Sequence, residues 1–211
     1  MGIDVRDTIA KTGLVPVVVI DDAADAVPAA LALAEGGVPV MEITLRTEAG
    51  LDAIEAVAKG APEVLTGAGT VMSVAGAEAA VARGARFIVS PGFDAGIVGW
   101  CIEHGIDVYP GCVTPTEIMA AIGMGLDVVK FFPANVYGGA AAIKALSGPF
   151  PGVRFIPTGG IDQSNLIDFV IPEVFAVGGG WLCPRKAIKE KRFGAIMEAC
   201  EKAVQAVEGG A

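Results

Sequence analysis

The sequence predicts an α/β fold in one domain, residues 1–211, built as a (β/α)8 barrel with a short N-terminal helix. Three observations point to this class. Short apolar runs rich in β-branched residues alternate with alanine-rich amphipathic runs along the whole chain. Glycines close the helical runs at near-regular intervals, at positions 36, 60, 84, 105 and 125. A doubly wound dinucleotide-binding sheet is the weaker alternative, because no predicted strand runs into G-x-G-x-x-G.

The first half of the chain is patterned as a leading helix followed by five βα units. Charged residues beside an apolar stripe predict the helix over 4–12. Asp21 or Asp22 is suited to cap the next helix, and Ser73 and Asp94 are suited to cap later ones. The expected strand and helix pairs cover 15–20 and 22–35, 38–45 and 48–59, 64–68 and 73–83, 87–90 and 94–104, and 107–110 and 115–124.

The second half continues the alternation with shorter elements. Residues 125–133 read Gly-Leu-Asp-Val-Val-Lys-Phe-Phe-Pro, and the β-formers between the glycine and the proline predict a sixth strand buried on both faces. The remaining expected elements are a helix over 139–146, a strand over 155–158, a short helix near 163–169, an eighth strand over 174–177 and a closing helix over 193–207.

Composition and charge narrow the function classes. The net charge of −9 argues against nucleic acid and anionic membrane as partners. No apolar run approaches the roughly 18 residues of a membrane span, and the four cysteines show no C-x-x-C pair, which is typical of reduced thiols in the cytoplasm. The single histidine, His104, is placed to cap a helix C-terminus, and one histidine is too few for a typical catalytic zinc site. We therefore expect a cytoplasmic protein that acts on a small molecule with organic groups alone, without metal or cofactor.

Lys130 lies in the middle of the predicted sixth strand, where a cation is costly. A buried lysine either pairs with an anion or releases its proton, and the neutral amine is a nucleophile. The sequence leaves two interpretations open, which are a functional amine and a structural ion pair at a strand end.

Polar residues gather where the predicted strands end, which is the active-site face of a barrel. Glu42, Thr44 and Arg46 alternate with apolar residues and share one face, because successive side chains of a strand point to opposite sides. We expect that face to point into the barrel mouth. The alternative is a half-solvated edge strand with a surface Glu and Arg.

Glycine clusters mark three further strand ends. Gly67-Ala68-Gly69 leads to Thr70, whose hydroxyl could donate to a ligand that approaches the bare backbone. The seventh and eighth strands run into Thr158-Gly159-Gly160 and Gly178-Gly179-Gly180. Backbone N–H groups at such turns bind phosphate, and the loops after strands seven and eight are the usual phosphate position of a barrel. Either cluster taken alone could be a plain turn.

With these residues placed, the chain resembles the 2-keto-3-deoxy-6-phosphogluconate (KDPG) / 4-hydroxy-2-oxoglutarate (KHG) aldolase family over nearly its whole length. The segments that carry the resemblance are Gly37-Val38-Pro39-Val40-Met41-Glu42-Ile43-Thr44-Leu45-Arg46-Thr47, Gly67-Ala68-Gly69-Thr70-Val71, Val89-Ser90-Pro91-Gly92, Val129-Lys130-Phe131-Phe132-Pro133-Ala134 and Gly148-Pro149-Phe150-Pro151. The resemblance implies a lyase, a class I (Schiff-base) aldolase that reversibly cleaves KDPG to pyruvate and glyceraldehyde 3-phosphate. It also implies a cytoplasmic homotrimer.

The resemblance also implies roles for residues. Lys130 would be the Schiff-base lysine and Glu42 the general acid/base, while Arg46 and Thr70 would hold the pyruvyl carboxylate. Three residues would line the pocket: Pro91, Phe132 and Thr158. Four glycines would lie at the phosphate end: Gly159, Gly160, Gly179 and Gly180.

One departure from the family pattern concerns Gly180. The family usually ends its eighth strand Gly-Gly-Ser-Trp, whereas this chain has Gly178-Gly179-Gly180-Trp181. Without the serine hydroxyl, a hydrogen bond to the charged phosphate is lost, which costs about 1.5–3 kcal/mol of binding free energy. The alternative substrate KHG, which would give pyruvate and glyoxylate, therefore stays open. Two other functions stay open: a phosphate-binding barrel isomerase or epimerase, and a barrel that binds sugar phosphates without catalysis.

Overall fold

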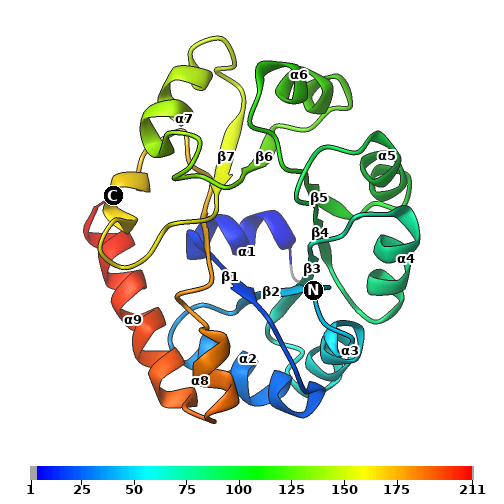
Figure 1. Ribbon diagram of the computed structural model, residues 1–211, viewed down its shortest axis with the longest axis vertical. Coiled ribbons are helices and arrows are strands. Elements are labelled where there is room, and N and C mark those ends of the chain that lie inside the picture. The colour runs from blue at the N-terminus through cyan, green and yellow to red at the C-terminus, as the bar shows by residue number, and fades with distance from the viewer. Residues whose placement is uncertain (1–3, 211) are drawn as a thin grey trace.

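The computed structural model describes residues 4–210 as an α/β fold in which helices surround parallel strands (Figure 1). Within these residues the strands are β1 (Leu14–Val18), β2 (Val40–Thr44), β3 (Leu65–Gly69), β4 (Phe87–Val89), β5 (Asp107–Tyr109), β6 (Val128–Phe131), β7 (Arg154–Pro157) and β8 (Val177–Gly179). The α-helices are α1 (Val5–Thr12), α2 (Ala26–Glu35), α3 (Gly50–Gly60), α4 (Val74–Ala82), α5 (Ala95–Glu103), α6 (Pro115–Gly123), α7 (Gly139–Ser147), α8 (Arg185–Lys189) and α9 (Phe193–Gly209). Two short 3-10 helices are η1 (Ala23–Asp25) and η2 (Leu166–Phe169).

The strands pair in parallel in two sets. Six form one sheet in the order β5-β4-β3-β2-β1-β8, and β6 pairs with β7. Single bridges join the two sets, between Gly111 and Lys130 beside β5 and between Thr158 and Gly178 beside β7. Since all pairs are parallel, the carboxyl ends of the strands meet on one side.

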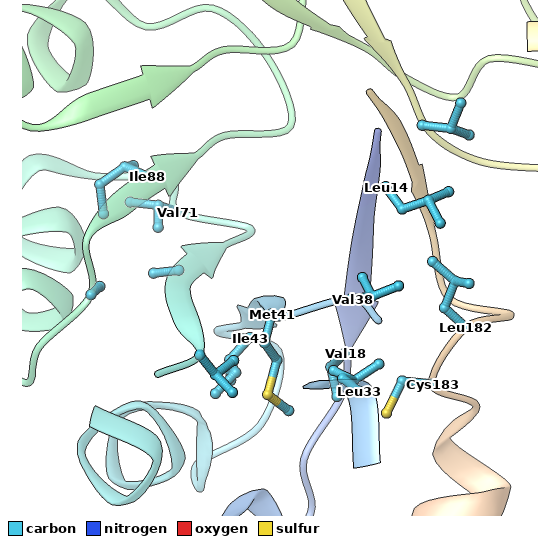
Figure 2. Close-up of a cluster of buried hydrophobic side chains, with 14 of the residues drawn as sticks. Leu14, Val18, Leu33, Val38, Met41, Ile43, Val71, Ile88, Leu182 and Cys183 are labelled. Atoms are coloured by element: carbon cyan, nitrogen blue, oxygen red, sulfur yellow. The ribbon is translucent and has the colours of Figure 1, made fainter. Parts of the chain in front are cut away.

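The alternation of side chains along the strands separates two cores. The outward-facing Met41 and Ile43 of β2 pack in one cluster with Val18 and with Leu33 of α2, as Figure 2 shows. Inward-facing residues near the strand starts form the other cluster, in which Val5 and Ile9 of α1 join Val15, Val40, Leu65, Phe87, Val128 and Ile156. Apolar side chains thus fill the amino-terminal half of the interior, and the polar residues of β2 lie at the carboxyl half.

Several helix ends agree with the sequence prediction. The Ser73 and Asp94 side chains accept hydrogen bonds from the N–H groups of Gly76 and Ile97, and His104 caps the C-terminus of α5. Three of the five predicted helix-closing glycines, Gly84, Gly105 and Gly125, adopt the positive φ that favours glycine. Two differ from this expectation: Gly37 takes the positive φ in place of Gly36, and Gly60 is the last residue of α3.

The end of the chain differs more from expectation. The predicted eighth strand over 174–177 lies three residues later, at Val177–Gly179, where Gly178 pairs with Val15. Val174 makes only a single bridge, to Phe155. Gly178 and Gly179 were predicted to follow the strand, yet their backbone pairs with β1 as the last strand of the six-stranded sheet. Helix α8 was not predicted, and the helix near 163–169 is the shorter η2.

The four cysteines are free and buried, as the sequence predicts. Burial raises the pKa of the Cys101 thiol to about 11 and, with a smaller contribution from Glu117, that of Cys112 to about 12. These thiols are therefore protonated at neutral pH and poor nucleophiles. Over residues 4–210, no helix combines the length and the apolar character needed to cross a membrane.

Candidate active site

A cavity of about 270 Å³ opens among the carboxyl ends of the strands. Its lining contains all eleven residues that the sequence reasoning proposed for the site: Glu42, Arg46, Thr70, Pro91, Lys130, Phe132, Thr158, Gly159, Gly160, Gly179 and Gly180. Three residues outside that set also line it: Val17, Thr44 and Ile161. Thr44 lies where the sequence predicts it, on the face that Glu42 and Arg46 share. Val17 could have been found from strand alternation, since it points inward like Val15, whereas no sequence signal marks Ile161.

Lys130 and Glu42 face one another in the buried interior of the fold. The Lys130 Nζ lies 3.3 Å from Glu42 Oε1, and the two side chains are 8% and 3% exposed. They come from β6 and β2, which share no ladder, so they meet across the interior rather than along a sheet. A buried ion pair loses much of its Coulombic gain to desolvation, so pairing alone is a weak reason to keep both charges inside. A carboxylate at this distance can accept a proton from the ammonium and leave a nucleophilic amine.

Phe132 lies beside the same ammonium. Its ring centroid is 5.4 Å from Lys130 Nζ, within the range of a cation–π contact, and its side chain is 39% exposed. Phe132 therefore covers the amine from the side of the cavity mouth.

The space for the Glu42 carboxylate comes from Gly69 on the neighbouring strand. A Cβ at Gly69 would lie 2.1 Å from Glu42 Oε1. The glycine that sequence reasoning assigned to ligand approach thus makes room for a side chain of the protein. The next residue, Thr70, has a φ of 58°, which is strained for a β-branched residue and is typical of backbone held for a function.

Arg46 enters the cavity just beyond the end of β2. Its Nε donates to the Thr44 hydroxyl at 3.2 Å. Among residues 4–210 it forms no ion pair, although five other arginines in the chain do or stack on aromatic rings. A guanidinium in a cavity without a protein carboxylate beside it is suited to an anionic ligand.

Glycines at the other side of the cavity also serve neighbouring side chains. A Cβ at Gly178 would lie 2.2 Å from Thr158 Oγ1, and one at Gly179 would lie 1.6 Å from the Trp181 ring. Gly159 and Gly160 adopt positive φ values of 98° and 75°. At Gly180 the nearest atom to an added Cβ is the Val17 carbonyl oxygen, at 3.5 Å, so only ordinary contact would result.

Pro91 is held at the cavity by Gly111, in the loop after β5. A Cβ at Gly111 would lie 2.1 Å from the Pro91 carbonyl oxygen, so the two backbones touch. The Ser90 hydroxyl donates to the Gly92 carbonyl at 2.8 Å and stiffens the same turn. In the described part of the chain, no three His, Cys, Asp or Glu side chains gather in a group that could hold a metal ion.

Comparison with known proteins places the chain in a family. The family model described as KDPG and KHG aldolase matches residues 5–199. The chain belongs to the KDPG/KHG aldolase family. It is 42% identical over 206 residues to the 2-dehydro-3-deoxy-phosphogluconate aldolase of Treponema pallidum, with 97% of this chain and 98% of that protein covered. It is 41% identical to the KHG/KDPG aldolase of Escherichia coli K12, with 94% of each covered.

A solved structure of the KDPG/KHG aldolase family has the same fold. The KDPG aldolase of Legionella pneumophila is 39% identical and matches with a TM-score of 0.91, over 95% of this chain and 98% of that one. That structure holds pyruvate captured at low pH as a covalent carbinolamine intermediate.

Proposed function

We propose that this protein is a class I aldolase that reversibly cleaves KDPG to pyruvate and glyceraldehyde 3-phosphate through a Schiff base, without a metal ion. The observation that carries the proposal is the buried Lys130 amine, 3.3 Å from the Glu42 carboxylate, in a cavity that also contains Arg46. The names of the family relatives and the carbinolamine of the Legionella pneumophila enzyme support it.

The chemistry begins at Lys130. The neutral amine adds to the substrate ketone, and loss of water from the carbinolamine gives a protonated imine that acts as an electron sink. Glu42 takes the proton of the C4 hydroxyl, directly or through water, as the C3–C4 bond breaks and the aldehyde leaves. The electron pair of that bond remains in the pyruvate enamine on Lys130. Glu42 returns a proton to the enamine carbon, and hydrolysis of the imine releases pyruvate.

The two ends of the substrate have different partners in this proposal. Arg46 and Thr70 bind the carboxylate, because a guanidinium fork and a hydroxyl suit its two oxygens. Pro91, Phe132 and Thr158 enclose the carbon chain. The phosphate lies near the backbone N–H groups at the glycines that end the seventh and eighth strands: Gly159, Gly160, Gly179 and Gly180.

Gly180 favours a second substrate. KHG carries no phosphate, so the missing hydroxyl at this position does not weaken its binding. We therefore propose KHG cleavage to pyruvate and glyoxylate as an alternative or additional activity. One retro-aldol assay that measures pyruvate release from each compound compares the two directly.

The covalent step has a direct test. Borohydride reduction in the presence of pyruvate should attach a pyruvyl group to Lys130, found by peptide mass spectrometry. Lys130→Ala should abolish both the adduct and the cleavage. An unmodified Lys130, or cleavage that survives the substitution, would refute the Schiff-base proposal. Binding of KDPG without any adduct would indicate a binding protein, and turnover without pyruvate release would indicate an isomerase or epimerase.

We also propose an assembly and a location for the protein. The single bridges beside β5 and β7 are consistent with one closed (β/α)8 barrel domain over the whole chain. Following the family resemblance, we propose that this domain forms a homotrimer. Free buried thiols are the cysteine usage of reducing compartments, which supports the cytoplasm. Sedimentation at several concentrations would test the trimer.

A further inference from the structure

Thr44 connects the end of β2 to two neighbours at once. Its side chain is buried, with 1% of the residue exposed. Its hydroxyl donates to the Val18 carbonyl oxygen at 3.0 Å and accepts from Arg46 Nε at 3.2 Å. Because the single hydroxyl proton goes to Val18, the lone pairs of the oxygen remain to receive the Nε–H group.

This contact determines which nitrogens of Arg46 can meet a ligand. A guanidinium pairs with a carboxylate either through Nε and one terminal nitrogen or through both terminal nitrogens. Thr44 occupies Nε. The two terminal nitrogens are left for the anion, at the end of a side chain that lines the cavity.

We propose that Thr44 is a positioning residue, which holds Arg46 by Nε so that both terminal nitrogens pair end-on with the substrate carboxylate. The inference rests on the proposed function, in which Arg46 binds that carboxylate. Thr44 itself acts only through Arg46. A second hydroxyl, that of Thr47, donates to the Ile20 carbonyl at 2.5 Å and ties the same loop to the segment after β1, without a hydrogen bond to the Arg46 side chain.

The test compares Thr44→Val, which keeps the shape and removes the hydroxyl, with Thr44→Ser, which keeps the hydroxyl. We expect Thr44→Val to raise the pyruvate concentration for half-maximal borohydride trapping roughly tenfold, with little change in trapping at saturation. Thr44→Ser should retain wild-type trapping. Methyl pyruvate, which lacks the anionic carboxylate, should be trapped equally by wild type and Thr44→Val.

Thr47→Val is the matched control, because it removes a similar tie from the same loop. We expect it to lower thermal stability as much as Thr44→Val does while leaving the pyruvate concentration dependence unchanged. The positioning role would be overturned if both valine variants raised the pyruvate concentration for half-maximal trapping equally. It would also be overturned if Thr44→Val impaired trapping of methyl pyruvate as much as trapping of pyruvate. Wild-type behaviour of Thr44→Val would overturn it too.

Arg46→Ala separates this inference from the proposed function. If Arg46→Ala leaves pyruvate trapping unchanged, the carboxylate role of Arg46 is wrong and the proposed site fails. If Arg46→Ala weakens trapping and Thr44→Val does not, only the positioning role fails. Trapping on Lys130 in the wild-type enzyme tests the Schiff base independently of both residues.

Discussion

Gly180 is a position where the addition of one side-chain hydroxyl group should change the substrate preference and little else. Its backbone lies outside the left-handed region, and an added Cβ would meet only the Val17 carbonyl oxygen at 3.5 Å. Gly180→Ser therefore introduces no steric conflict. The new hydroxyl would lie at the proposed phosphate end of the cavity, the position where the family usually carries serine.

The expected effect follows from one hydrogen bond to a charged group. Such a bond contributes about 1.5–3 kcal/mol, which corresponds to a roughly tenfold to hundredfold change in an equilibrium. In the aldol direction, kcat/KM for glyceraldehyde 3-phosphate should rise by that factor, mainly through KM. The value for unphosphorylated glyceraldehyde should stay near that of the wild type, and so should the cleavage of KHG.

Two other glycines serve as controls for Gly180→Ser. Gly194→Ser, at an exposed site on α9 with no atom within 4 Å of the added Cβ, should change neither stability nor specificity. Gly179→Ser should destabilise the protein strongly, because the Cβ would lie 1.6 Å from the Trp181 ring. Equal changes for the phosphorylated and plain aldehydes, or no change for either, would refute the assignment of Gly180 to the phosphate end.

Three more predictions concern the proposed catalytic pair Lys130 and Glu42, the strained residue Thr70 and a surface ion pair. Lys130→Met and Glu42→Leu each leave a buried charged group unpaired and should lower the free energy of unfolding in urea by about 3–5 kcal/mol. The double variant should recover most of that loss while all three stay inactive; an equally unstable double variant would contradict the pairing. Thr70→Gly relieves about 1–2 kcal/mol of left-handed strain, against about 0.5–1 kcal/mol of added chain entropy, so it should be at least as stable as the wild type yet bind pyruvate more weakly. Thr70→Val keeps a β-branched residue at the positive φ and therefore keeps the strain. If Thr70→Val were more stable than Thr70→Gly, the strain at position 70 would be refuted. Hydrogen bonds from the Arg6 guanidinium hold the pKa of Asp127 below its ordinary value. Because this pair is half-exposed, Arg6→Gln should lower the free energy of unfolding by only about 0.5 kcal/mol at pH 7. The difference between wild type and variant should shrink as pH falls below about 4, through the lowered pKa of Asp127. A stability difference that grows as the pH falls would contradict this prediction.

Much of the fold could be predicted because its elements carry periodic signals. Alternating apolar residues mark β2, and amphipathic runs ending in glycine mark most helices. The predicted boundaries of β1 and β2 are too wide, since Ile20 and Val38 are fully buried but lie beyond the strand ends. Hydrophobicity reports burial, and these residues are buried in the core without belonging to the sheet. Strand β8 was misplaced because two of its three residues, Gly178 and Gly179, have no side chains and therefore show no alternation of apolar and polar residues.

The candidate site could be predicted residue by residue because parallel strands bring their carboxyl ends together. Glu42 and Lys130 are 88 residues apart in sequence, yet strand direction alone places both at one end of the fold. Which atoms touch could not be predicted. The use of Arg46 Nε by Thr44 depends on side-chain geometry beyond the strand end, where alternation no longer holds.

The glycines around the cavity have two different physical causes that look alike in sequence. Gly69, Gly178 and Gly179 lack side chains because Glu42, Thr158 and Trp181 occupy the space that a Cβ would need. A substitution there displaces a side chain of the protein itself before it affects a ligand. Gly180 has free space instead. Under the proposed function, substitutions at the first three positions should disturb the site, while a change at residue 180 should alter the accepted aldehyde without moving Lys130 or Glu42.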